Sequence, residues 1–431
     1  MLTALFNAFK IPDIRRKLMF TVLIIGIYRV GSWIPAPGVD VDILRVATGA
    51  SGSAGGLVGI LNVFAGGALQ QMAIFALGIM PYITASIILQ LLVVVIPRLE
   101  TLQQEGEQGR RKITQYTRYL TVALALLQST GLVTLARSGT LFGNGQTVLV
   151  NDSPWLILFI VLTLTAGTAT VMWLGELITQ RGVGNGMSIL IYVSIISQFP
   201  SQLFLVKTQR GWGVVTSVLL IGVLITFAVV FIEQGQRRIP VQYARRQVGR
   251  RTYGGQATYI PLKVNQSGVI PVIFASSLLY VPQLASQVTD WSFLQTFVNE
   301  WLQPPSGEIT WVYIAIFGGM TVFFAYFYTA ITFNPVEVAD NMKKYGGFVP
   351  GIRPGRQTAE YLDKVLTRLT LPGALYLTVV AVMPFIAFKV FNVTQFPLGG
   401  VSLLIMVGVA LEAAKQVESQ LMQRNYEGFL S

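Results

Sequence analysis

Side chains that could perform covalent chemistry are scarce in this chain. Its 431 residues include no histidine and no cysteine, which removes the commonest general base, the commonest metal ligand and the thiolate nucleophile. Glycines crowd the stretch Gly182–Gly186, but no strand precedes it, so it lacks the context of a nucleotide-binding loop. We therefore expect no enzyme, no metal and no cofactor, although counting residues leaves serine and aspartate chemistry open.

The composition indicates a membrane protein. Hydrophobic residues make up 53% of the chain and charged residues 12%, and the mean hydropathy is +0.60. A spanning helix needs roughly 20 apolar residues, and the basic residues before the first hydrophobic run indicate a retained span, not a cleaved signal. Ten spans are predicted, at about 18–34, 71–96, 119–137, 155–175, 186–204, 213–232, 268–284, 311–333, 369–391 and 397–417.

The basic residues predict the orientation of these spans. If the N-terminus is cytoplasmic, all but six of the 31 lysines and arginines fall on the cytoplasmic side. This strong bias agrees with the positive-inside rule and with an even number of spans. The six others are Arg29, within the first span, and Arg45, Arg137, Lys207, Arg210 and Lys389, which fall outside.

Two spans share a Gly-x-x-Pro pattern. Gly78–Ser86 reads GIMPYITAS and Gly268–Ser276 reads GVIPVIFAS. Because proline removes a backbone donor, we expect each helix to be interrupted there and to face protein or water on one side. Paired interrupted helices indicate a pathway between two repeats; two ordinary kinked helices are the alternative.

Neither of these spans carries a charge. Ion-coupled transporters generally need carboxylates or comparable groups inside the membrane. The residues predicted to line the interrupted helices are apolar or small, and an apolar constriction can gate by dewetting. The pattern therefore favours a pathway for something large or variable. The lining residues are Ile79, Ile83, Ser86, Ile273 and Ser276.

A short apolar segment between the first two spans has glycine on both sides. Thr48–Gly56 is flexible by composition, Leu57–Phe64 is apolar but too short to span, and Gly66 and Gly67 follow it. Two interpretations remain open. The segment is either re-entrant or interfacial, or it is a movable stopper in a cavity between the halves.

Two loops predicted on the cytoplasmic side, Ile239–Leu262 and Asn334–Arg368, are long and basic. Either they are solvated positive-inside loops, or they form a docking surface for an acidic or nucleic-acid partner, since arginine binds carboxylate and phosphate in a fork geometry. Tyrosines interleaved with arginines in the first loop are consistent with RNA contact.

Motifs spread along the chain resemble the SecY family of bacterial-type protein-conducting channels (SecY/Sec61-alpha). The resemblance runs from the first helix to the C-terminal tail. Its motifs are FAGGAL (64–69), FALGIMPYITASIILQLL (75–92), GEQGRRKITQYTRY (106–119), GVGNGMSI (182–189), PLKVNQSGVIPVIFASS (261–277), FNPVEVADNMKKYGGFVPGIRPG (333–355) and YLDKVLTRLTLPGALYL (361–377).

The resemblance implies an all-α polytopic membrane protein with ten transmembrane helices in two inverted five-helix halves, a clamshell around a central pore. The N-terminal half would span 1–210, with a plug segment at about 55–67. The C-terminal half would span 211–431, with basic cytoplasmic loops at about 234–267 and 334–368. Such a channel passes unfolded secretory polypeptides and releases hydrophobic segments sideways into lipid. It lies in the plasma (inner) membrane with both termini cytoplasmic.

The same resemblance implies four groups of functional residues. The pore ring would be Ile79, Ile83, Met187, Ile191, Ile273 and Ile405, where Met187 replaces the isoleucine of most family members and its thioether can still fill the gap. The plug would be Leu57, Val58, Ile60, Leu61, Val63 and Phe64. Polar lateral-gate candidates are Gln90, Gln128, Ser276 and Ser277. Partner docking would use Arg245, Arg246, Arg250, Arg251, Arg353 and Arg356.

Implied partners are the SecE subunit and SecG, the motor ATPase SecA, the ribosome with its RNA, signal sequences, nascent polypeptides and membrane lipid. Two other classes of function were weighed. A secondary transporter would share an inverted repeat but should show an ion or substrate site at mid-membrane, and none is visible. A membrane receptor or scaffold would explain the basic loops but not the paired interrupted helices.

Overall fold

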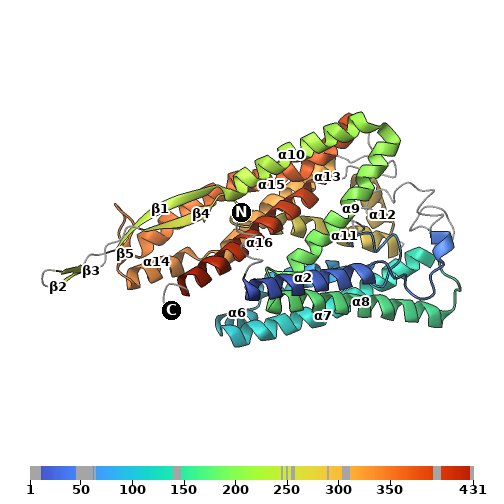
Figure 1. The fold of residues 1–431 in the computed structure, drawn as a ribbon, viewed down its shortest axis with the longest axis horizontal. Coiled ribbons are helices and arrows are strands. Elements are labelled where there is room, and N and C mark those ends of the chain that lie inside the picture. The colour runs from blue at the N-terminus through green and yellow to red at the C-terminus, as the bar shows by residue number, and fades with distance from the viewer. Residues whose placement is uncertain are drawn as a thin grey trace. The chain divides into compact units, whose positions relative to one another are not determined.

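The computed structural model describes residues 11–44, 62, 65–137, 139, 147–243, 246–248, 251–253, 258–288, 291–302, 311–391 and 399–427. Most of these residues are helical (Figure 1). The helices are α2 (Pro12–Gly31), α5 (Met80–Val95), α6 (Pro97–Gln104), α7 (Glu107–Arg137), α8 (Pro154–Arg181), α9 (Gly186–Arg210), α10 (Trp212–Gln234), α11 (Ile270–Val288), α12 (Ser292–Phe297), α13 (Trp311–Thr332), α14 (Pro335–Lys344), α15 (Arg356–Phe391) and α16 (Gly400–Glu427), with a π-helical turn η1 (Val298–Leu302).

The long helices coincide with the predicted spans. Each of the ten predicted ranges overlaps one helix, and seven of these helices are long and apolar enough to cross a membrane by length and composition alone. An eighth is possible if α5 and α6, which bend by 100° at Ile96, count as one span. Pro97 accounts for the bend, because proline disfavours helical backbone in the residue before it. The chain is an all-α polytopic membrane protein.

Two compact units divide the chain. The first comprises residues 1–219, 277–313 and 384–431, and the second comprises 220–276 and 314–383. These units follow spatial contacts, so they are not the sequence halves 1–210 and 211–431, which stay a prediction.

In the first unit, glycines allow helices to approach closely. α5 packs on α7, α7 on α8, α8 on α2 and α9, and α9 on α16. A Cβ atom on Gly167 of α8 would collide with the carbonyl of Ile74, and one on Gly186 of α9 would collide with the carbonyl of Gly175. Small residues at such crossings are how membrane helices gain van der Waals contact without a hydrophobic driving force.

The segment before α5, residues 65–79, is a series of turns inserted into the first unit. Its backbone pairs with the residues after α2: Ala36 N donates to the Met72 carbonyl (2.8 Å) and Ile74 N donates to the Ile34 carbonyl (2.9 Å). Met72 is fully buried in the left-handed region (φ 44°). The segment belongs to a buried apolar core with parts of α7 and α8. Irregular backbone is therefore satisfied here by protein.

The prediction of a helix from residue 71 is wrong, and so is the idea that the prolines interrupt helices. Gly78 has φ 56° and ends the turns, and Pro81 is the second residue of α5. In the same way Gly268 has φ 60°, and Pro271 is the second residue of α11. Proline is well suited to this position, because the first N–H groups of a helix lack intrahelical partners. The repeated pattern marks the start of a helix in both places.

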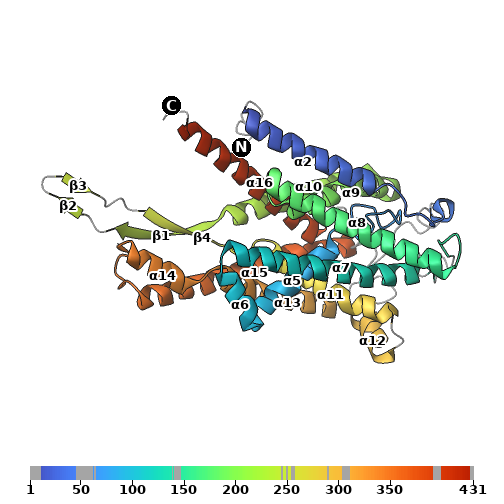
Figure 2. The same ribbon diagram turned by 90° about the horizontal axis from the view of Figure 1, so that it is seen from below.

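Strands occur only in the basic loops among the described residues. They are β1 (Gln236–Tyr243), β2 (Arg246–Val248), β3 (Arg251–Tyr253), β4 (Thr258–Lys263) and β5 (Gly347–Phe348). β1 pairs antiparallel with β4, from Gln236 opposite Lys263 to Val241 opposite Thr258, and with β5 at its far end. The ribbon continues from α10, and the short β2–β3 pair lies beyond it (Figures 1 and 2). Strands from both basic loops thus meet in one sheet.

A second apolar core lies beneath this sheet, in the second unit. Ile239 and Val241 of β1 point to the same face, because strand side chains alternate, and both are buried with Leu262 of β4. Residues of α14 and α15 complete the cluster. These loops are therefore folded structures, not simple solvated connectors.

Several helices extend beyond the predicted spans. α7 begins at Glu107 instead of 119, α15 at Arg356 instead of 369, and α16 ends at Glu427 instead of 417. The added turns are polar, so a hydropathy criterion could not find them.

Replacing Gly268 by alanine should destabilise the protein through the backbone alone, since no atom lies within 4 Å of a Cβ placed there. A left-handed L-residue costs about 1–2 kcal/mol, and asparagine tolerates it better. We expect Gly268→Ala to lower the free energy of unfolding by about 1 kcal/mol and Gly268→Asn by less. The control is Gly319→Ala, which has equally open space inside α13 and should not destabilise. Equal losses in both alanine variants would contradict this account.

Candidate functional site

The six pore-ring candidates are all buried side chains near helix starts or inside helices. Ile79 is the N-cap residue of α5 and Ile83 lies in its first turn. Met187 and Ile191 lie in the first two turns of α9, and Ile405 is 1% exposed in α16. These five belong to the first unit. Ile273 lies in the first turn of α11, in the second unit.

Ile83 and Ile273 occupy equivalent places in their helices. The Ile83 N–H donates to the carbonyl of Ile79 (3.1 Å), and the Ile273 N–H donates to the carbonyl of Val269 (3.3 Å). Each of these bonds joins the fourth residue of the helix to the residue directly before the helix, and in α5 the Tyr82 N–H donates to the same Ile79 carbonyl (3.1 Å). The Gly-x-x-Pro pattern therefore places an isoleucine at the fourth residue of both α5 and α11.

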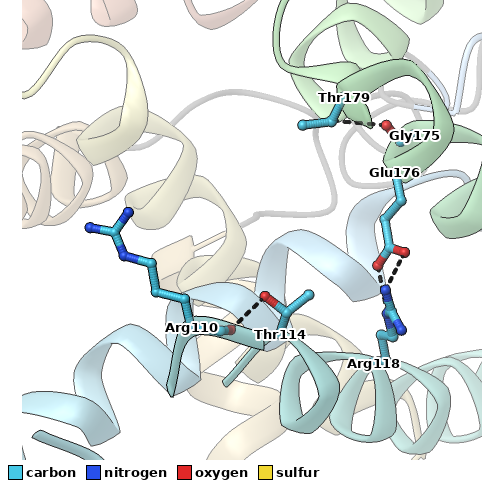
Figure 3. Close-up of polar contacts among 6 residues, drawn as sticks. All are labelled: Arg110, Thr114, Arg118, Gly175, Glu176 and Thr179. Carbon is cyan, nitrogen blue, oxygen red and sulfur yellow. Dashed lines mark hydrogen bonds and ion pairs between the residues drawn. The ribbon is translucent and has the colours of Figure 1, made fainter. Parts of the chain in front are cut away.

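The glycine-rich stretch 182–186 forms the connection between α8 and α9. Asn185 caps α9, because its Oδ1 accepts from the N–H groups of Met187 (3.0 Å) and Ser188 (3.4 Å). The Gly186 N–H donates to Oγ1 of Thr179 (2.9 Å), which itself donates to the Gly175 carbonyl (3.0 Å; Figure 3). The glycines let the backbones of α8 and α9 approach closely, and Asn185 caps α9. These structural roles account for the glycine-rich motif without nucleotide binding.

The side chain of Met187 packs against α8. A Cβ atom on Gly175 would collide with Sδ of Met187, so the thioether lies directly over this glycine. The unbranched methionine thus occupies space that a glycine on the neighbouring helix provides.

An ion pair connects α7 to α8 beside the ring candidates. Nε of Arg118 donates to Oε1 of Glu176 (2.7 Å) and Nη2 donates to Oε2 (2.6 Å), a bidentate arrangement (Figure 3). Glu176 follows Gly175 directly, and the charges of both partners act on Tyr82, which precedes Ile83. Bidentate pairs between arginine and carboxylate are geometrically specific. This pair therefore fixes α7 and α8 close to two ring positions.

A buried amide positions the start of α11 in the second unit. Nδ2 of Asn265 donates to Oε2 of Glu233 (3.0 Å) and to the carbonyl of Gly268 (3.0 Å). Oγ of Ser267 donates to Oδ1 of Asn265 (3.2 Å). Asn265 is 3% exposed, so its hydrogen bonds are shielded from water. The network holds the left-handed glycine that precedes Ile273.

The polar gate candidates make only local contacts in the described part of the chain. Gln90 is exposed and reaches Ser86 on its own helix at 3.5 Å. Gln128 is half-buried on α7, and no hydrogen bond joins it to Gln90 within the described residues. Ser276 donates to the Ile273 carbonyl (2.9 Å). Ser277 is buried, and its hydroxyl has no hydrogen-bond partner among the described residues.

The docking arginines divide between described and undescribed positions. Arg353 is exposed, and its carbonyl accepts from Oγ1 of Thr358 (2.9 Å). Arg356 pairs with Glu360 on the surface of α15 (2.9 Å). Arg246 and Arg251 lie in β2 and β3. Arg245, Arg250 and all six plug candidates (Leu57, Val58, Ile60, Leu61, Val63, Phe64) lie outside the described residues.

Sequence reasoning missed the polar residues that hold the ring positions. Arg118 and Glu176 each lie one residue outside the predicted spans 119–137 and 155–175, and Asn265 lies in no predicted span. Fifty-eight residues separate the two members of the ion pair, so no local spacing signals it. The available signal was an isolated charge or amide beside an apolar run, which needs a partner there.

Comparisons with known proteins agree on one family. A family model described as SecY matches residues 73–414. The protein translocase subunit SecY of Streptomyces scabiei is 58% identical over 439 residues, and that of Mycobacterium tuberculosis (strain ATCC 25618 / H37Rv) is 52% identical over 443 residues; both alignments cover all of both chains.

Solved structures share the fold. A structure described as that of a protein conducting channel has a TM-score of 0.63 at 18% identity and covers 96% of each chain. A second, from work on the plug domain of SecY, has a TM-score of 0.62 at 18% identity with the same coverage.

The ion pair between Arg118 and Glu176 should contribute measurably to stability. In a double-mutant cycle with Arg118→Ala and Glu176→Ala, we expect a coupling of about 1 kcal/mol in the free energy of unfolding, the upper part of the range for partly exposed pairs. The same cycle on Arg356 and Glu360, an exposed pair four residues apart on one helix, should give at most about 0.5 kcal/mol. Equal couplings would show that the pair between helices has no special role.

Proposed function

This chain belongs to the SecY family, and we propose from this premise that it forms a protein-conducting channel. It passes unfolded secretory polypeptides across the membrane and releases hydrophobic segments sideways into lipid. The observation that carries the proposal is the doubled helix start, which gives α5 and α11 a buried isoleucine in the first turn within a family of translocase subunits. The channel performs no covalent chemistry.

The barrier of this channel is a ring of apolar side chains. Its members are Ile79, Ile83, Met187, Ile191, Ile273 and Ile405. Their burial in the described chain supports this assignment. A narrow apolar ring excludes water and ions by dewetting, yet it makes no specific bonds with a passing chain. It can therefore accommodate polypeptides of any sequence.

Opening requires a second state of the channel. Leu57–Phe64 is the plug that closes the resting pore, and Gln90, Gln128, Ser276 and Ser277 are the polar side of a lateral gate. The hydrogen bonds of Gln90 and Ser276 stay within their own helices, and even interhelical polar contacts in membranes contribute only about 0.6 kcal/mol each. An incoming apolar helix can therefore compete at this gate. A partner and a signal sequence open the channel by binding the open state more tightly.

The folded basic loops form the docking surface for the partners that supply energy. Arg245, Arg246, Arg250 and Arg251 lie in the loop at about 234–267, and Arg353 and Arg356 lie in the loop at about 334–368. The pairing of β1 with both β4 and β5 supports a joint surface. The partners are the motor ATPase SecA and the ribosome, with its RNA. SecE and SecG are the accompanying subunits.

The channel lies in the plasma membrane with both termini in the cytoplasm. The distribution of lysine and arginine supports this orientation. Residues 1–210 and 211–431 are the two inverted halves, and the equivalent starts of α5 and α11 support the repeat.

A crosslinking experiment tests the pathway directly, and the chain is naturally free of cysteine. Cysteine is placed at Ile83 or Ile405 and in the middle of a stalled secretory polypeptide, which is trapped in membranes with the motor and ATP. We expect crosslinks at both positions that depend on the signal sequence, because the polypeptide must pass the ring. A matched cysteine at Leu220, on the exposed face of α10, should give none. Export without crosslinks at either ring position would place the pathway elsewhere.

Polar substitutions in the ring should weaken the resting seal. We expect Ile83→Asn and Ile273→Asn to raise the resting ion conductance of the reconstituted channel about tenfold and to let defective signal sequences pass. A polar side chain that destabilises the closed state by about 1.4 kcal/mol shifts the equilibrium between closed and open states tenfold. Ile83→Leu conserves volume and should stay close to the parent. Unchanged conductance and unchanged export selectivity in both asparagine variants would refute the ring assignment.

A further inference from the structure

Arg29 is a charged residue in the last turn of α2 that the proposed channel mechanism does not use. Twelve residues separate it from Lys17 at the basic end of the same helix, which is about 18 Å at 1.5 Å per residue. A guanidinium this far into the predicted first span, at about 18–34, is costly unless its donors are satisfied. Its partners therefore indicate what it is for.

The guanidinium of Arg29 joins two separate segments. Its Nη1 donates to the carbonyl of Gly66 (2.9 Å) and to Oγ of Ser197 on α9 (2.8 Å). No carboxylate lies within ion-pair distance of it among the described residues. Arg29 is thus a cross-link between neutral acceptors, not half of a salt bridge.

Glycine at position 66 permits this contact. Its φ of 65° lies in the left-handed region. A Cβ atom there would come within 3.1 Å of both Nη1 of Arg29 and Cα of Ser194. The segment before α5 is therefore pressed against α9 at the point where the arginine binds both.

Tyr28 adds a second link in the same turn of α2. Its hydroxyl hydrogen bonds with Oγ of Ser194 on α9 (2.7 Å), and its ring stacks on Phe75 with centroids 6.0 Å apart. Two consecutive residues of α2 thus each contact both α9 and the segment of residues 65–79.

Both linked elements carry ring candidates. The segment 65–79 ends at Ile79, and Ile83 follows within one turn. On α9, Ile191 lies three residues before Ser194, and Met187 one turn earlier. We propose that Arg29 is a positioning residue that binds the segment before α5 to α9 and so holds four of the six ring side chains in register. This proposal rests on the proposed channel function.

An arginine suits this task because its planar group offers several donors in a fixed geometry and stays charged at every physiological pH. Lysine could donate to the same acceptors only as a flexible point charge. Glutamine would keep a polar side chain but lose the reach and the charge. We therefore expect the closed channel to leak least in the parent, more in Arg29→Lys and most in Arg29→Gln.

The test measures resting ion conductance of the full chain, reconstituted with its co-purifying subunits and without substrate. We expect Arg29→Gln to raise conductance about tenfold, the scale of losing a charge-assisted hydrogen bond. Arg29→Lys and Ser197→Ala should show smaller rises. The double variant with Arg29→Gln and Ser197→Ala should leak less than the two single effects combined, because the two residues share one hydrogen bond. Oγ of Ser197 also donates to the Gly66 carbonyl itself (3.5 Å), so a small further rise over Arg29→Gln is expected. Arg137→Gln, which removes an exposed charge paired with Asp152, is the matched control and should stay at the parental value.

A distance measurement checks positioning independently of transport. Spin labels on cysteines at Val95 of α5 and Phe204 of α9, both exposed, should give a broader or longer distance distribution in Arg29→Gln than in the parent or in Arg137→Gln. Parental conductance and an unchanged distribution in Arg29→Gln would overturn the proposal, as would additive leaks in the double variant. If the parent shows no signal-dependent transport, the channel function itself fails, and the distance distribution alone decides the role of Arg29.

Discussion

The first unit depends on one constraint, which is that an irregular backbone segment inside a membrane protein must find hydrogen-bond partners in the protein. Residues 65–79 make successive turns where a helix would be expected from hydropathy. Their N–H and carbonyl groups pair within the turns and with the chain after α2. Because this pairing determines where the turns end, it also determines where α5 begins. The position of Ile79 and Ile83 along the helix axis follows from that start.

Glycine and proline have precise local roles around this constraint. Gly78 and Gly268 supply left-handed backbone, and the prolines three residues later occupy positions where no donor is lost. Sequence analysis identified this repeat but assigned it the wrong cause, since it treated proline as a breaker inside a helix. The physical signal was available: a proline three residues after a glycine is as compatible with a helix start as with a kink, and only tertiary pairing decides between them.

Features of the fold that depend on local sequence could be predicted, whereas features that depend on distant partners could not. Ten apolar runs predicted ten helices, because hydropathy and helix length are local properties. The helical turns at Glu107 and Arg356 were missed because they are polar. The sheet that joins the two basic loops was missed because Gln242 and Phe348 pair across more than one hundred residues, and strand pairing over such separations leaves no pattern in either segment. The polar contacts that link Arg118, Asn265 and Arg29 to other helices or segments were missed because their partners lie tens of residues away along the chain, outside any local pattern.

Met187 illustrates how an unbranched side chain is accommodated between two helices. A β-branched side chain keeps its bulk near its own helix, whereas methionine extends its thioether and fills irregular gaps. Here the thioether lies over Gly175, the residue directly before Glu176, whose carboxylate pairs with Arg118. The contact with α8 thus depends on a glycine that the adjacent ion pair helps to hold in position. An unbranched side chain can therefore fill the space between two helices where the neighbouring helix offers a glycine, and the proposed ring is best understood together with the polar contacts that hold its helices.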